Sequence, residues 1–100
     1  MKQLIFIRRV VGKSMAPRLR SGALVLATPL RRKLRPGQVV ILEHQGKEKI
    51  KRIERIDPDK KQLFVIGDNL AASSDSRHFG WITEKAVRGR VFWPRHLHNN

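Results

Sequence analysis

The 100-residue sequence contains no cysteine, and acidic residues are scarce. Without cysteine the chain can form neither a disulfide nor a thiolate metal site, and its redox compartment stays undetermined. Aspartate and glutamate number 8 against 22 lysines and arginines, which gives a formal net charge of +14. This charge predicts attraction to nucleic acid, anionic lipid or an acidic protein partner, and it does not choose among them.

Long apolar runs are also missing. The longest uncharged apolar run near the start, Leu4–Ile7, lies between Lys2 and Arg8. A membrane-spanning helix needs about 20 apolar residues, so this run is too short to cross a bilayer. It also lacks the length and the small-residue cleavage site of a secretory signal. We therefore expect a cytoplasmic protein, one that could touch a membrane surface peripherally through its charge.

No internal repeat or low-complexity linker divides the chain. Its length predicts one domain, and 40% hydrophobic residues suffice for a modest core. We expect a single domain over residues 1–95 and a frayed tail over residues 96–100.

Short apolar segments separated by turn residues predict a mostly β domain. Strands are expected over residues 4–11, 23–27, 39–43, 63–66 and 87–93. Residues 49–56 are ambiguous, because Ile50, Ile53 and Ile56 recur every three residues and partly fit a helix. Their β-branched content and the turn at Asp57–Asp59 favour a strand instead.

The most polar stretch runs from Gly67 to Gly80 and follows an apolar strand candidate. Its fourteen residues include two Asp, one Asn, three Ser and one Arg, more than a turn requires. Such clustered hydroxyls and charges indicate a site. The sequence offers two partners for it, Ser14 after a glycine and Lys51 on a predicted strand.

Each partner has an ordinary alternative. A serine hydroxyl is a weak nucleophile until a base takes its proton, and a lone serine more often caps a turn. Lys51 is one of 22 cations and could simply be solvated. A buried lysine, however, loses its proton more easily and can act as a general base.

Two other kinds of site are disfavoured. Gly12-Lys13-Ser14 ends a phosphate-loop pattern, but the required earlier glycine is replaced by Ile7. The four histidines have no Asp or Glu partner at a suggestive spacing, and His96 and His98 lie in the expected frayed tail, so we expect no metal and no cofactor. His78 alone lies within the polar stretch.

Three sequence boxes, in order, make the chain resemble the type I signal peptidase superfamily, serine proteases with a Ser/Lys dyad. Residues 14–19, Ser-Met-Ala-Pro-Arg-Leu, match a box Ser-Met-x-Pro-Thr-Leu except at Arg18. Residues 51–53, Lys-Arg-Ile, match the second box. Residues 67–80 match Gly-Asp-Asn, Ser-x-Asp-Ser-Arg, an aromatic position and glycine without a gap. The resemblance covers about residues 10–93.

The resemblance implies a fold and a set of catalytic roles. The fold would be a coiled β half-barrel of short antiparallel strands. Ser14 would be the nucleophile, Lys51 the general base, and Ser73 the hydroxyl that orients the lysine amine. The backbone N–H of Ser14 would hold the oxyanion. Many bacterial relatives add a serine hydroxyl as a second donor two residues earlier, but Gly12 at that position has no side chain to donate.

The remaining implied roles concern the surroundings of the dyad. Asp75 and Arg77 would form a bracing ion pair, and Asp68 would be the partner of Arg52. Gly12, Met15 and Pro17 are expected in the substrate or oxyanion region. Ala23 and Gln38 stand where relatives often have aspartate. The resemblance therefore does not determine how the sheet is arranged there or which substrate contacts form.

The resemblance further implies a serine endopeptidase that removes a leader or propeptide from a precursor polypeptide. The chain lacks the membrane spans and the large inserted domain of some relatives. This minimal form looks most like the maturation protease of nickel-type superoxide dismutase. The alternatives are a general signal peptidase-like enzyme, or a basic nucleic-acid-binding or self-cleaving repressor-type β domain. Phosphate contacts for the last could come from residues 31–33, 60–61, 88 and 90.

Overall fold

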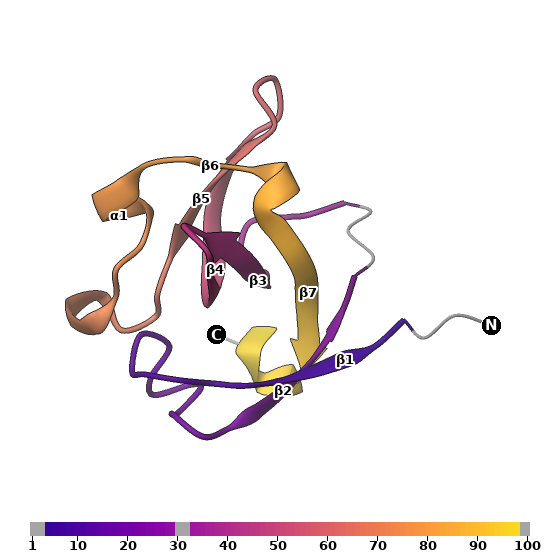
Figure 1. Cartoon of the computed structure of the whole chain (residues 1–100), viewed down its shortest axis with the longest axis vertical. Helices are drawn as coiled ribbons and strands as arrows, with labels where there is room; N and C mark the ends of the chain where they lie inside the picture. Colours follow the sequence, from indigo (N-terminus) through magenta and orange to yellow (C-terminus); the bar gives the residue numbers. More distant parts are fainter. Residues whose placement is uncertain (1–3, 30–32, 99–100) are drawn as a thin grey trace.

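A single antiparallel sheet of seven strands dominates the computed structural model, which describes residues 4–29 and 33–98 (Figure 1). The strand order is β1-β2-β7-β3-β4-β5-β6. The strands are β1 (Phe6–Arg9), β2 (Leu24–Thr28), β3 (Val39–His44), β4 (Lys47–Asp57), β5 (Gln62–Ile66), β6 (Ile82–Thr83) and β7 (Val87–Trp93). The helical elements are short: η1 (Leu70–Ala72), α1 (Ser76–Phe79), η2 (Glu84–Ala86) and η3 (Arg95–His98). The prediction of a mostly β fold is confirmed.

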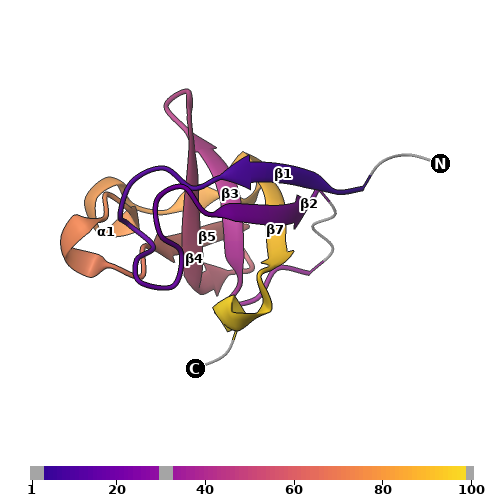
Figure 2. The same cartoon turned by 90° about the horizontal axis from the view of Figure 1, so that it is seen from below.

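β3 lies in the interior because its apolar residues are covered on both faces. Val39 and Ile41 belong to one buried cluster, and Val40 and Leu42 belong to another. Successive side chains of a strand point to opposite faces, so this one strand contributes side chains to two hydrophobic clusters. Figures 1 and 2 show that the sheet is strongly curved.

β4 continues from β3 through a two-residue turn. Gln45 and Gly46 both have positive φ, 52° and 78°, which matches the twist of a tight hairpin. β4 then pairs with β3 along Lys47–Arg52 and with β5 from Arg52 onward. The strand assignment for residues 49–56 is confirmed, and the helical alternative is wrong.

The chain's end corrects one expectation. Residues 96–100 were predicted to fray, yet Arg95–His98 form η3 and Leu97 is fully buried. Leu97 packs in the cluster that contains Met15 and Leu19, and its carbonyl accepts a 2.8 Å hydrogen bond from Arg52. Burial of Leu97 and this hydrogen bond, together with one between His96 Nε2 and the Arg18 carbonyl at 2.9 Å, anchor the segment. Residues 99 and 100 lie outside the described residues.

No helix within residues 4–29 and 33–98 has the length and apolar character needed to cross a membrane. Arg31 and Arg32, offered above as phosphate contacts, also lie outside the described residues.

Candidate active site

Asp75 is the centre of the polar stretch, and its side chain is completely buried. The residue caps the short helix α1, whose first turn donates the Arg77 N–H to Asp75 Oδ1 at 3.1 Å. The His78 side chain completes a capping box by accepting from the Asp75 N–H. Capping satisfies N–H groups that a helix start leaves without a partner. The cap therefore fixes where the carboxylate points.

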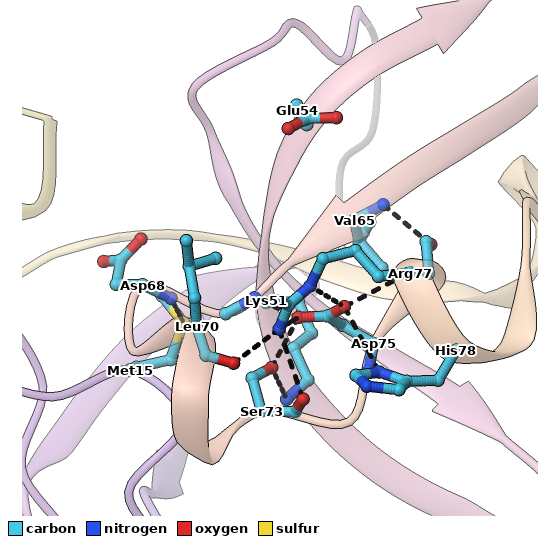
Figure 3. A network of polar contacts seen from close by, with 12 residues as sticks. Met15, Lys51, Glu54, Val65, Asp68, Leu70, Ser73, Asp75, Arg77 and His78 are labelled. Carbon is cyan, nitrogen blue, oxygen red and sulfur yellow. Dashed lines mark hydrogen bonds and ion pairs between the residues drawn. The ribbon is translucent and has the colours of Figure 1, made fainter.

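Five hydrogen bonds reach the Asp75 carboxylate (Figure 3). Arg77 donates three of them, the Gly67 N–H donates one at 2.9 Å, and the Ser73 hydroxyl donates one at 2.6 Å. Burial alone would raise the pKa of Asp75, but these donors outweigh it and hold the pKa well below its usual range. Asp75 is therefore a fixed negative charge at neutral pH.

Ser73 connects this carboxylate to Lys51. Lys51 Nζ lies 3.0 Å from Ser73 Oγ, and the lysine is only 4% exposed. An ionised carboxylate can only accept, so the Ser73 proton must go to Asp75. Ser73 Oγ consequently presents a lone pair to Lys51 and accepts from its amine. This contact uses one N–H of the amine, so the lone pair of a neutral Lys51 stays available to accept a proton.

The same surroundings favour the neutral amine. Burial lowers the pKa of Lys51, and the positive charges of Lys49 and Arg77 add to that effect. The negative charge of Asp75 opposes it, but the net shift is downward. Lysine is a proton acceptor only when uncharged, so the shift brings Lys51 closer to the state a base requires.

The loop that carries Ser14 is held against the polar stretch. The Asn69 N–H donates to the Ser14 carbonyl at 2.8 Å, and Asn69 Nδ2 donates to the Lys13 carbonyl at 3.1 Å. Figures 1 and 2 both show this loop, which follows β1, beside the segment that carries η1. Two segments more than fifty residues apart in sequence are thus joined at Ser14.

Gly67 permits this close approach. A Cβ added there would lie 2.6 Å from the Ser14 carbonyl oxygen and would collide with the Ser73 hydroxyl. Only glycine leaves room for both serine-bearing segments to meet at the end of β5.

Arg52, beside Lys51, points to the other face of β4. It forms a two-point ion pair with Asp68, with both N–O distances 2.8 Å. Arg52 also donates to the carbonyls of Gly37 and Leu97. This arginine ties the last sequence box to the turn before β3 and to the chain's end.

Ser14 and Lys51 line one open pocket of about 390 Å³. Gly12 and Met15 line it as well, whereas Pro17 does not. No hydrogen bond joins Ser14 Oγ to Lys51 Nζ in the described part of the chain, and the amine contacts Ser73 Oγ at 3.0 Å. Ser14 is half-buried on the pocket wall, and Met15 is buried beneath it.

Sequence reasoning left out several residues of this site. Gly67 and Asn69 fall inside the third box, but spacing alone could not show that they touch the Ser14 segment. Lys49 lines the pocket two residues before Lys51, a separation that puts both side chains on one face of a strand. That alternation was the available signal for Lys49.

Comparison with known proteins places the chain in a family. The chain matches the Peptidase S24-like family over residues 2–92. It is 29% identical over 115 aligned positions to mitochondrial ATP-independent inner membrane protease subunit 1b of Arabidopsis thaliana, covering 88% of this chain and 68% of that protein. It is 46% identical over 35 residues to signal peptidase I of Bacillus caldolyticus, covering 32% of this chain and 19% of that enzyme.

The family match spans nearly the whole sheet together with the Ser14, Lys51 and Asp75 segments. The chain belongs to the Peptidase S24-like family, within the type I signal peptidase superfamily. It is accordingly a serine peptidase.

Proposed function

We propose that this protein is a processing endopeptidase in which Ser14 is the nucleophile and Lys51 is the general base. The observation that carries the proposal is the chain of contacts from Asp75 through Ser73 to a buried Lys51, which lines the same pocket as Ser14. A buried amine held by a hydroxyl whose own proton is committed elsewhere suits proton abstraction better than it suits a structural ion pair.

In the proposed cycle, neutral Lys51 accepts the Ser14 proton while Oγ attacks the carbonyl carbon of the scissile peptide bond. Lys51 then returns that proton to the departing amine, and an ester to Ser14 remains. A water molecule, deprotonated by Lys51, attacks the ester and releases the carboxyl product, and Ser14 regains its proton. Holding the two groups together makes each proton transfer effectively unimolecular.

The Ser14 N–H is the proposed oxyanion donor. Asn69 holds the Lys13 carbonyl, and the C=O and N–H of a trans peptide point in opposite directions. The Ser14 N–H is thus turned away from Asn69. A backbone donor fixed before reaction can stabilise developing charge without reorganising.

The substrate is expected to be an extended polypeptide with small residues before the cut. In support, β4 residues Lys47–Lys51 pair with β3 on one side, and the pairing with β5 begins only at Arg52. The pocket lies between that stretch of β4 and residues 8–15. An extended peptide can be accommodated between two such segments.

The test is cleavage of a leader-bearing precursor by purified variants. Ser14→Ala and Lys51→Met should each reduce kcat/KM at least about a thousandfold, as expected when a nucleophile or base is removed. Both should keep the wild-type circular dichroism spectrum. Thr83→Ala and Lys60→Met, at exposed positions away from the pocket, are the matched controls. Wild-type cleavage rates in either dyad variant would rule out the dyad.

For the precursor itself, we propose the leader-bearing form of a nickel-type superoxide dismutase. The support is the resemblance of residues 68–73 to the small maturation proteases of that enzyme. Incubating the protein with this precursor and sequencing the new N-terminus tests it. Equal cleavage of unrelated secretory precursors would instead indicate a general signal peptidase-like enzyme.

A further inference from the structure

Cationic residues from two segments of the chain line the pocket that contains Ser14. Arg9 and Lys13 come from β1 and the loop that follows it, and Lys49 comes from β4. The pocket's one carboxylate belongs to Glu48, and it is already bound by Arg8 at 2.7 and 3.3 Å. The charge that a substrate meets there is therefore strongly positive.

Three of these cations have no acidic partner. Arg9, Lys13 and Lys49 form no ion pair with any residue in the described ranges, 4–29 and 33–98. One N–H of the Arg9 guanidinium donates to the Gly22 carbonyl at 2.8 Å. Lys49 Nζ lies 5.1 Å from the centre of the Phe79 ring, which holds the ammonium group in place.

We propose that this pocket selects precursors with acidic side chains close to the scissile bond, and that Arg9, Lys13 and Lys49 determine this specificity. The inference rests on the proposed peptidase function. Unpaired cations on facing walls attract carboxylates on a bound peptide, and they repel a basic segment. Lys51 is excluded from this role because its amine must be neutral to act.

The shape and lining of the site favour a peptide over nucleic acid. Apolar groups from Val10, Val11, Ile50 and Ala72 lie among the cations on the same walls. A mixed apolar and cationic pocket around a nucleophile suits alternating side chains of an extended peptide. Phosphate-backbone binding requires an open basic surface more than a pocket, and an oligonucleotide serves below as a competitor.

The experiment uses paired peptides with a small-residue cleavage site, in which one position within three residues of the cut is Glu or Gln. The measured quantity is the ratio of kcat/KM for the Glu peptide to that for the Gln peptide. This ratio cancels any effect of a variant on the Ser14 and Lys51 chemistry, which both peptides share. At least one position should give a ratio of about two to five, the range for a partly exposed ion pair.

Charge reversal on either wall should invert that preference. Lys49→Glu and Arg9→Glu are expected to bring the ratio below one, whereas Lys60→Glu in the exposed β4–β5 turn leaves it unchanged. Raising the salt concentration from about 0.02 to 0.5 M should bring the wild-type ratio toward one, because mobile ions screen the attraction.

Failure of this inference differs from failure of the proposed function. Cleavage that requires Ser14 but gives ratios near one at every position overturns the specificity and leaves the peptidase intact. Absence of any Ser14-dependent cleavage overturns both. Ratios near one, together with inhibition by an oligonucleotide that Arg9→Glu relieves, would assign the cations to nucleic acid instead.

Discussion

Lys51 illustrates how its surroundings set one cationic residue apart from the others. The chain has 22 cationic side chains, and the structure buries Lys51 to 4% exposure beside Ser73. Neighbouring charges then tune the amine: Asp75 favours its protonated form, and Lys49 disfavours it. The balance can be altered by changing a neighbour that does not touch the reacting atoms.

Lys49→Gln should move the acidic limb of the kcat/KM profile to higher pH. Removing the Lys49 charge takes away one influence that lowers the pKa of Lys51, so the amine holds its proton to a higher pH. The profile of kcat/KM reports groups of the free enzyme, so this quantity is the one to measure. Lys47→Gln, at an exposed position on the same face of β4, is the control and should leave the limb in place. A shift to lower pH would contradict this electrostatic account.

Because of Asp75, the free energy of unfolding should fall as the pH is lowered. Its pKa is lower in the folded protein than its ordinary value near 3.8, so its contribution is present above that value and is lost as pH falls through the folded pKa. Urea titrations should show the free energy of unfolding falling below about pH 4.

Asp75→Asn should show a smaller fall over the same acidic range. At pH 7 it should lose about 3–5 kcal/mol of stability, since it leaves a buried network without its charge. The exposed Asp59→Asn is the control and should keep the wild-type slope. Equal slopes in all three proteins would show that other carboxyl groups cause the acid dependence.

At the scale of elements, the site forms where the end of β5 meets the loop after β1. Gly67 is the point of contact, with the Ser14 carbonyl and the Ser73 side chain both packed against its Cα. Neither neighbouring segment is a long regular element, so the geometry depends on tight packing between irregular backbone.

Gly67→Ala should therefore damage both stability and catalysis. The added methyl group must displace the Ser14 or the Ser73 segment, at a cost of about 1–3 kcal/mol for an overpacked site. Gly89→Ala provides a matched control, because its Cβ would press on Phe6 and the Thr28 carbonyl, away from the pocket. Both variants should unfold at lower urea concentration, but only Gly67→Ala should lose kcat/KM per folded molecule. Equal activity in the two would remove Gly67 from the site.

The elements could be predicted from sequence to very different degrees. Val39–Leu42 and Leu63–Ile66 are short, β-rich and flanked by turn residues, and they form strands as expected. The helix α1 was not predicted, because its capping box uses His78 where Glu or Gln is the usual signal. Leu97 was missed because one apolar residue among histidines gives no periodic pattern.

The sequence pointed to some residues of the candidate site but not to their contacts. The order of the three boxes drew attention to Ser14, Lys51 and Ser73. Spacing could not reveal that the Ser73 proton goes to Asp75, which decides how the lysine amine is held. That relation depends on the tertiary approach of β4 and the capped helix.

On the scale of the whole molecule, positive charge exceeds negative charge by 14. Five arginine–carboxylate ion pairs occur among residues 4–29 and 33–98, and the three involving Arg8, Arg55 and Arg88 are exposed at the surface. Exposed pairs contribute little to stability, so most cations repel one another without compensation. Self-repulsion of this kind favours expansion of the folded chain.

Added salt should therefore stabilise the protein. Raising sodium chloride from about 0.02 to 0.3 M shortens the screening length to below 10 Å, which weakens repulsion between surface cations. If screening raises the free energy of unfolding by about 1 kcal/mol, Tm rises by roughly 4–8 °C for a domain of this size. Calorimetry across this salt range measures the effect.

A double variant, Lys60→Glu with Lys85→Glu, isolates the cause. Each reversal changes the charge by two, so the formal net charge falls from +14 to +10, and both positions are exposed. The variant should start with a higher Tm at low salt and gain less from added salt than the wild type. An equal gain in both proteins would point to an effect of salt on apolar burial, because that effect does not depend on net charge.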